Sequence, residues 1–124
     1  MSERDRIMQN YDDVWGSIDT LMSSMSDDDW ATQSLCPDWT AHGVMSHLAG
    51  IEHALSGWLP SSADEKLPFD HIAGYIEGAQ SWSGAELAAD YRRLIDERRA
   101  QLSALSDEDF ARPSPTPVGP ATYG

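Results

Sequence analysis

Histidine is the residue type in this chain best suited to chemistry, and three of the four histidines lie within CPDWTAHGVMSHLAGIEHALSGWL, residues 36–59. An imidazole binds transition metals and exchanges a proton near neutral pH. If the segment is a helix that turns about 100° per residue, His42 and His53 lie nearly opposite its apolar stripe, and His47 lies about 60° from the stripe's centre. We therefore expect His47 alone to point inward. The stripe consists of Val44, Leu48, Ile51, Leu55, Trp58 and Leu59.

Small residues share the side of this helix on which His47 lies: Gly43, Gly50, Ala54 and Gly57. A glycine inside a helix lowers helix stability by roughly 1 kcal/mol relative to alanine. Another interaction must therefore offset the cost of three glycines. One explanation is a close crossing with another helix, in which His47 is an ordinary core histidine. The other is space above the imidazole for a metal ion or a ligand. The positions three and four residues from His47 carry no second histidine, so further metal ligands would come from other helices.

Apolar periodicity predicts a first long amphipathic helix from about Glu3 to Met25, with one seam facing the core. The seam consists of Ile7, Tyr11, Val14, Ile18, Leu21 and Met25, and it is flanked by Met8, Trp15 and Met22. Ser26 is the predicted cap of a short acidic turn, and Thr40 is the predicted N-cap of the helix that carries His47. Because the connection between the two long helices is short, we expect them to be antiparallel neighbours.

Two more helices are predicted further along the chain. Residues 69–80 favour a short helix, with His71 near its start as a weaker candidate ligand. Ser83 begins an S-x-x-E capping box that opens a long helix running to about Leu105. Its apolar stripe is Leu87, Tyr91, Leu94, Leu102 and Leu105. Arg98 falls near the centre of this stripe, so its guanidinium either reaches solvent along the core or meets an acid or an anionic ligand.

Composition limits the partners and the location. The 124 residues include 21 acids and 8 bases, a net charge of −13, so we expect no binding to nucleic acid or to an anionic membrane. No apolar run approaches the ~20 residues of a membrane span, and the N-terminus lacks the apolar core of a signal peptide. The single cysteine, Cys36, excludes an intramolecular disulfide, which favours a cytoplasmic location. As a nucleophile Cys36 is a weaker candidate, because no adjacent histidine serves as its base.

The segment CPDWTAHGVMSHLAGIE resembles the hallmark of the N-terminal domain of mycothiol-dependent maleylpyruvate isomerase, a branch of the DinB-like superfamily of metal-binding helical bundles. C-P-x-W-T, H-L-A-G and a following acidic residue are all present, and TPVGPATYG is similar to the connector before that family's last bundle helix. The resemblance implies an all-α, up-and-down bundle of three long helices plus one short helix. The fourth bundle helix would be missing or supplied by a partner. Residues 1–111 would form the bundle domain, and 112–124 the Pro/Gly-rich connector.

By the same resemblance His47 matches the first metal ligand, and the remaining protein ligands would lie on the helix after the connector, beyond Gly124. The implied activity is that of a thiol-dependent isomerase or transferase that uses a divalent metal, zinc first, and mycothiol or a similar low-molecular-weight thiol. The metal would deprotonate the thiol, the thiolate would add to a cis double bond, and its elimination would give the trans isomer. Arg98 would bind a carboxylate of the substrate.

The alternative is a non-catalytic helical module for binding or oligomerisation. A bundle that lacks one helix exposes the apolar seams of the others, and an exposed patch above a few hundred Å² usually has a partner. A second copy of the chain in a homodimer is one such partner.

Overall fold

The computed structural model describes residues 3–34, 39–59, 67–110, 113–114 and 121–122. Four helices make up the bundle: α1 (Glu3–Ser24), α3 (Ala41–Leu55), α4 (Asp70–Ala79) and α5 (Gly84–Ser103). Two short helices and two paired strands complete the described elements: α2 (Asp27–Ala31), α6 (Asp107–Phe110), β1 (Pro113–Ser114) and β2 (Ala121–Thr122). The predicted all-α helical fold is confirmed, and the described residues include three long helices and one shorter helix. Within the described ranges, no helix has both the length and the apolar content needed to span a membrane.

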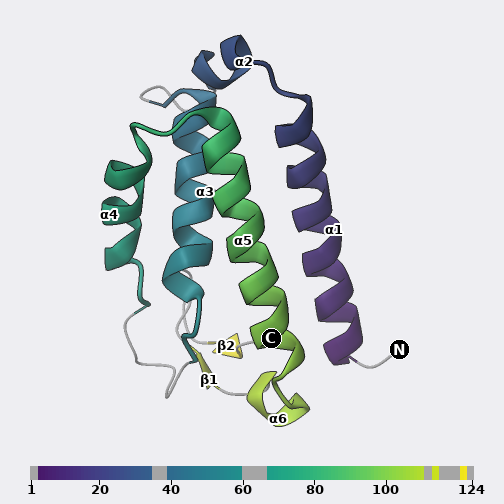
Figure 1. Ribbon diagram of the computed structural model, residues 1–124. Coiled ribbons are helices and arrows are strands. Elements are labelled where there is room, and N and C mark those ends of the chain that lie inside the picture. The colour runs from purple at the N-terminus through teal and green to yellow at the C-terminus, as the bar shows by residue number, and fades with distance from the viewer. Residues whose placement is uncertain (1–2, 35–38, 60–66, 111–112, 115–120, 123–124) are drawn as a thin grey trace.

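The long helices lie side by side, and α5 packs against both α1 and α3 (Figure 1). The short helix α4 packs along another side of α3. In Figure 1 the chain runs up α1, down α3, up α4 and down α5, so each of these helices is antiparallel to the one before it. The starts of α3 and α5 and the end of α4 therefore meet at one end of the bundle, near α2.

Side-chain caps begin the helices where the sequence predicts them. The Thr40 hydroxyl accepts a hydrogen bond from the Gly43 N–H at 3.2 Å, at the start of α3. Ser83 and Glu86 form a reciprocal capping box at the start of α5. Ser26 caps α2 in the same way. Each cap pairs backbone N–H groups that the first helical turn leaves without partners, which is typically worth ~1 kcal/mol.

The buried face of α5 is the centre of the hydrophobic core. Its predicted apolar stripe is confirmed, with four members buried and the last one half-buried: Leu87, Tyr91, Leu94, Leu102 and Leu105. The other helices contribute large side chains to the same cluster, among them Trp15, Met22, Trp30 and Met45. Burial of this apolar surface is the main stabilising contribution to the fold.

α1 turns a different face to the core from the one that its apolar periodicity predicts. Trp15 and Met22, expected at the edge of the seam, are each only 3% exposed. Val14 and Leu21, expected within the seam, are 57% and 54% exposed. One residue along a helix is a rotation of about 100°, so neighbouring positions form two distinct apolar stripes. The prediction that Val14 and Leu21 lie in the core is wrong.

α3 differs from the prediction in the same way. Its buried residues are Met45, Ser46, Ala49, Gly50 and Ala54. The predicted stripe is only half-buried: Val44, Leu48, Ile51, Leu55, Trp58 and Leu59. The helix ends at Leu55, so Trp58 and Leu59 of the predicted stripe lie beyond it, and Gly57 turns the chain away with a φ of 77° that glycine adopts without strain.

The crossing of α3 and α4 explains Gly50. A Cβ atom at this position would lie 3.2 Å from the Cγ2 atom of Ile72 and 3.5 Å from its carbonyl oxygen. The first distance is tighter than ordinary van der Waals contact, so a side chain here would push α4 away. Of the two explanations for the glycines of α3, the close helix crossing is confirmed at Gly50.

Candidate functional site

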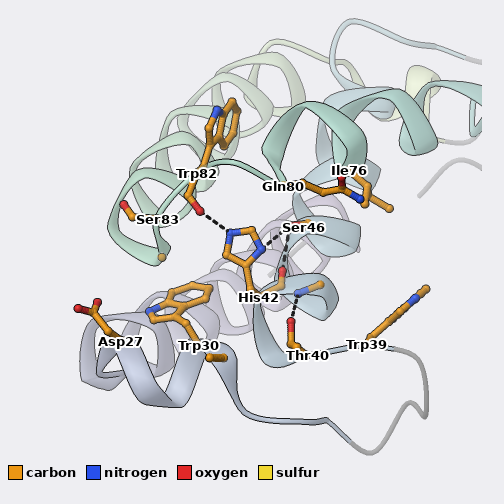
Figure 2. Close-up of a pocket in the computed structure, with 13 residues that line it drawn as sticks. Asp27, Trp30, Trp39, Thr40, His42, Ser46, Ile76, Gln80, Trp82 and Ser83 are labelled. Atoms are coloured by element: carbon orange, nitrogen blue, oxygen red, sulfur yellow. Dashed lines mark hydrogen bonds between the residues drawn. The ribbon is translucent and has the colours of Figure 1, made fainter.

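A cavity of about 820 Å³ opens at the end of the bundle where α3 and α5 begin. Its wall comes from α2, the first turns of α3, the end of α4 and the turn before α5 (Figure 2). Aromatic and polar side chains are mixed in the lining, including Trp30, Trp39, His42, Ser46, Gln80 and Trp82. A concave site of this size with a few polar groups is typical of small-molecule binding.

His42 lies in the wall of this cavity, as Figure 2 shows. Its Nε2 atom is 2.9 Å from the carbonyl oxygen of Trp82, and a carbonyl only accepts, so Nε2 carries a proton and donates it. Its Nδ1 atom is 3.4 Å from the Oγ atom of Ser46, and the Ser46 hydroxyl donates to the His42 carbonyl at 2.9 Å. The prediction that His42 faces away from the bundle is wrong. Its side chain ties α3 to the turn before α5.

Trp30 forms the floor beneath His42 and fixes how closely α5 approaches. The indole is 6% exposed, and its centroid lies 6.0 Å from that of the His42 ring in an edge-to-face arrangement. Gly84, the first residue of α5, lies against the indole so closely that a Cβ atom would overlap the ring. A glycine at this position therefore lets α5 begin directly on Trp30.

His47 lies one turn further along α3 and is half-buried. Its ring centroid is 5.0 Å from that of Trp39, which also lines the cavity, so His47 stands behind this wall. Neither ring nitrogen has a hydrogen-bond partner among the described residues, and no buried side-chain nitrogen among them lacks one. Among the described residues, nothing occupies the two ring nitrogens of His47, so they are candidates to bind a ligand or a metal ion.

The other candidate ligands do not gather around His47. His53 is exposed, with its ring 5.4 Å from the ring of Tyr75, and His71 is exposed in the first turn of α4. Cys36 lies outside the described residues. Across the described parts of the chain, no group of three histidine, cysteine or acidic residues is arranged to hold a metal ion. Protein zinc sites use three or four protein ligands, so the described residues alone do not fit a complete zinc site.

Arg98 meets an acid inside the bundle. Its Nε atom donates to the Glu52 carboxylate at 3.0 Å, and the two side chains are 2% and 15% exposed. The guanidinium also donates to the Leu55 carbonyl and to the Gln101 side chain. Trp15 donates its indole N–H to the other Glu52 oxygen at 3.3 Å. The binding of a substrate carboxylate by Arg98 stays a prediction, and such a ligand would compete with Glu52.

Comparison with known protein families decides where the chain belongs. The family described as the mycothiol maleylpyruvate isomerase N-terminal domain matches residues 11–124, which is most of the chain. The chain belongs to this family. No curated protein matches it, and no solved structure matches it.

As a member of the mycothiol maleylpyruvate isomerase N-terminal domain family, the chain shows what its HLAGIE segment does structurally. His47 begins the segment beside the cavity wall, Gly50 permits the α4 crossing, and Glu52 pairs with Arg98. The sequence pattern did not reveal the cavity, because the position of His42 opposite the apolar stripe predicted a side chain that faces away from the bundle. The small side chains of Ser46, Ala49 and Gly50 on the same side as His42 were the available signal that this face of α3 is covered.

Proposed function

We propose that this domain binds a low-molecular-weight thiol of the mycothiol type and a small substrate, and acts as a thiol-dependent isomerase or transferase. The family match and a cavity large enough for a small molecule support this proposal. The single observation that carries it is the His47 imidazole, which has no hydrogen bond to any described residue and lies beside Trp39, itself part of the cavity wall. The cytoplasmic location inferred from the single cysteine and the composition belongs to the same proposal.

His47 is the proposed ligand for a divalent metal ion, with zinc as the first candidate. One imidazole does not hold a catalytic zinc ion, so its other ligands must come from outside the described residues. What the described residues supply is a binding cavity, the His47 imidazole and an indole beside it.

Metal content tests the role of His47. The wild-type chain, purified without chelator, is expected to hold about one divalent ion per one or two chains, and His47→Ala is expected to hold none. His53→Ala is the matched control, since it removes an exposed imidazole from the same helix. A wild type without metal, or a His47→Ala variant that keeps it, would contradict the proposal.

Thiol binding tests the cavity. Gln80→Trp places an indole at a lining position and is expected to weaken mycothiol binding, measured by calorimetry, at least ~10-fold. Gln9→Trp makes the same change at an exposed position on α1, away from this cavity, and should leave the affinity unchanged. Equal binding by the two variants would show that the thiol does not enter the cavity.

The alternative of a helical binding module is favoured by a different observation. Val14 and Leu21 of α1 are more than half exposed, although they are large and apolar. The homodimer that such a surface suggests stays a prediction.

A further inference from the structure

The buried indole of Trp30 has an N–H group without a hydrogen-bond partner. The side chain is 6% exposed, and its Nε1 atom donates to no described residue. No buried side-chain nitrogen in the described part of the chain lacks a partner, so Nε1 lies at a surface. Trp30 is part of the cavity wall, and Figure 2 shows its nitrogen edge beside the start of α5. An indole N–H only donates, so this edge of the ring needs an acceptor.

The start of α5 places further donors beside this edge. A Cβ atom at Gly84 would overlap the Nε1 and Cδ1 atoms of Trp30, so the first residue of α5 lies against the nitrogen edge of the ring. The backbone N–H groups of Gly84 and Ala85 belong to the first helical turn, and among the described residues neither has a partner. These N–H groups point out of the helix start, which the dipole of a 20-residue helix makes positive. The unpaired donors therefore lie together on one side of the cavity.

A carboxylate lines the same side of the cavity. Asp27 and Trp30 are three residues apart in α2, so their side chains leave the same face of that helix. Figure 2 shows the nitrogen edge of the Trp30 ring turned toward Asp27. The Asp27 carboxylate has no hydrogen bond and no ion pair with any described residue. The cavity therefore offers unpaired donors and an unpaired acceptor next to one another.

The charges around the cavity favour a zwitterion over a simple anion or a simple cation. No lysine or arginine of the described residues lines the cavity. Glu86, whose carboxylate accepts from the Ser83 N–H, adds a second acid at the start of α5. A lone carboxylate on the N–H groups would be repelled by Asp27 and Glu86, and a lone ammonium would leave those N–H groups unpaired. A molecule that carries both charges on neighbouring groups satisfies the donors and the acid at once.

The rest of the cavity determines what the zwitterion carries. About 820 Å³ is more than an ammonium and a carboxylate fill, and the lining beyond them includes the indole of Trp39 and the side chain of Ile76. We propose that this cavity binds a free α-amino acid with a large apolar side chain. Its carboxylate accepts from Trp30 and Gly84, and its ammonium donates to Asp27. Its side chain packs against Trp39 and Ile76. The proposal does not rest on the thiol-dependent function.

Three matched probes test the need for both charges. L-phenylalanine carries both, 3-phenylpropionate lacks the ammonium, and phenethylamine lacks the carboxylate. Calorimetry with the full chain, without thiol or added metal, is expected to show at least ~10-fold tighter binding of L-phenylalanine than of either other probe. Equal binding of 3-phenylpropionate or of phenethylamine, or no binding of L-phenylalanine, would overturn the proposal. Because thiol and metal are absent from this experiment, such a failure would leave the thiol-dependent function to its own tests.

A matched pair of variants locates the binding. Asp27→Asn removes the cavity carboxylate and should weaken L-phenylalanine binding at least ~10-fold. Asp28→Asn changes the neighbouring exposed acid of the same helix, which does not line the cavity, and should leave the affinity unchanged. Trp30→Phe keeps an aromatic ring, removes the N–H donor and should also weaken binding, and circular dichroism checks that each variant folds. If Asp27→Asn binds L-phenylalanine as tightly as the wild type, the acid does not hold the ammonium and the proposal is wrong.

Discussion

The Arg98 guanidinium of α5 and the Glu52 carboxylate of α3 form an ion pair inside the bundle, with Nε 3.0 Å from Oε2. Gln101 extends this contact by accepting from Arg98 and from the Gly57 N–H and by donating to the Trp58 carbonyl. The network therefore fixes the end of α3 and the turn that follows it onto α5. It also gives the acidic residue of the HLAGIE segment a structural role.

Breaking this ion pair should destabilise the fold strongly. Arg98→Met leaves the Glu52 carboxylate without its cation in a mostly buried place, and we expect a loss of about 3–5 kcal/mol in the free energy of unfolding. The double variant Arg98→Met/Glu52→Leu removes both charges and should recover most of that loss, because an apolar pair needs no compensation. Urea unfolding measures the free energy of unfolding of the single and the double variant. A mild effect of Arg98→Met would show that the pair contributes little and would favour a ligand-binding role for Arg98.

Gly84 and Gly78 should respond in opposite ways to the same substitution. Gly84→Ala forces a Cβ atom into the buried Trp30 indole, which should cost about 1–3 kcal/mol. Gly78→Ala, in α4, meets nothing within 4 Å and should stabilise the helix by about 0.5–1 kcal/mol. The midpoints of thermal or urea unfolding report both changes. A neutral Gly84→Ala would mean that the Trp30 ring relaxes without penalty.

The sequence predicts where the helices start better than it predicts their buried faces. Capping depends on residues three positions apart, so Thr40 and Ser83 could be identified from local chemistry alone. The choice between two adjacent apolar stripes depends on which helix packs on them. In α1 the Trp15 and Met22 stripe packs on α5, and the Val14 and Leu21 stripe does not. Periodicity within α1 contains no information on that choice.

The candidate site was predicted only in part for the same reason. His47 as a metal ligand stays a prediction, and the apolar stripe beside which it was expected is in fact half-exposed. His42 was assigned to the opposite face, where the structure has the turn before α5 and the Trp82 carbonyl. The position of Trp82 depends on the whole path from α3 through α4, which no local pattern specifies.

Replacement of His42 should show whether its bond to Trp82 stabilises the end of the bundle. His42→Leu leaves the Trp82 carbonyl without its donor, and we expect a loss of about 1–3 kcal/mol. His53→Leu is the control on the same helix, since that side chain is exposed, and its effect should stay within about 0.5 kcal/mol. Hydrogen exchange around Trp82 should accelerate in His42→Leu alone. Equal behaviour of the two variants would contradict this role for His42.

Tyr91 makes the stability of the fold sensitive to alkaline pH. The side chain is 2% exposed, and burial, followed by the nearby Glu52 charge, raises the pKa of its hydroxyl well above the usual value near 10. The unfolded chain then loses the phenolic proton at a lower pH than the folded chain does. The stability that this group contributes is therefore fully present below about pH 10 and is lost as the pH rises further, with a limiting slope of about 1.4 kcal/mol per pH unit.

The variant Tyr91→Phe isolates this effect, because it keeps the buried ring and removes the proton. Its free energy of unfolding should fall less than that of the wild type between pH 8 and pH 11, measured by urea unfolding at each pH. The absorbance of tyrosinate provides a second measurement, since Tyr91 should ionise only together with unfolding. If the two proteins lose stability in parallel over this range, Tyr91 does not hold its proton more tightly in the folded chain. Another group would then account for the alkaline transition. One candidate is Tyr75, which donates to Asp90 and whose own pKa is also raised by burial.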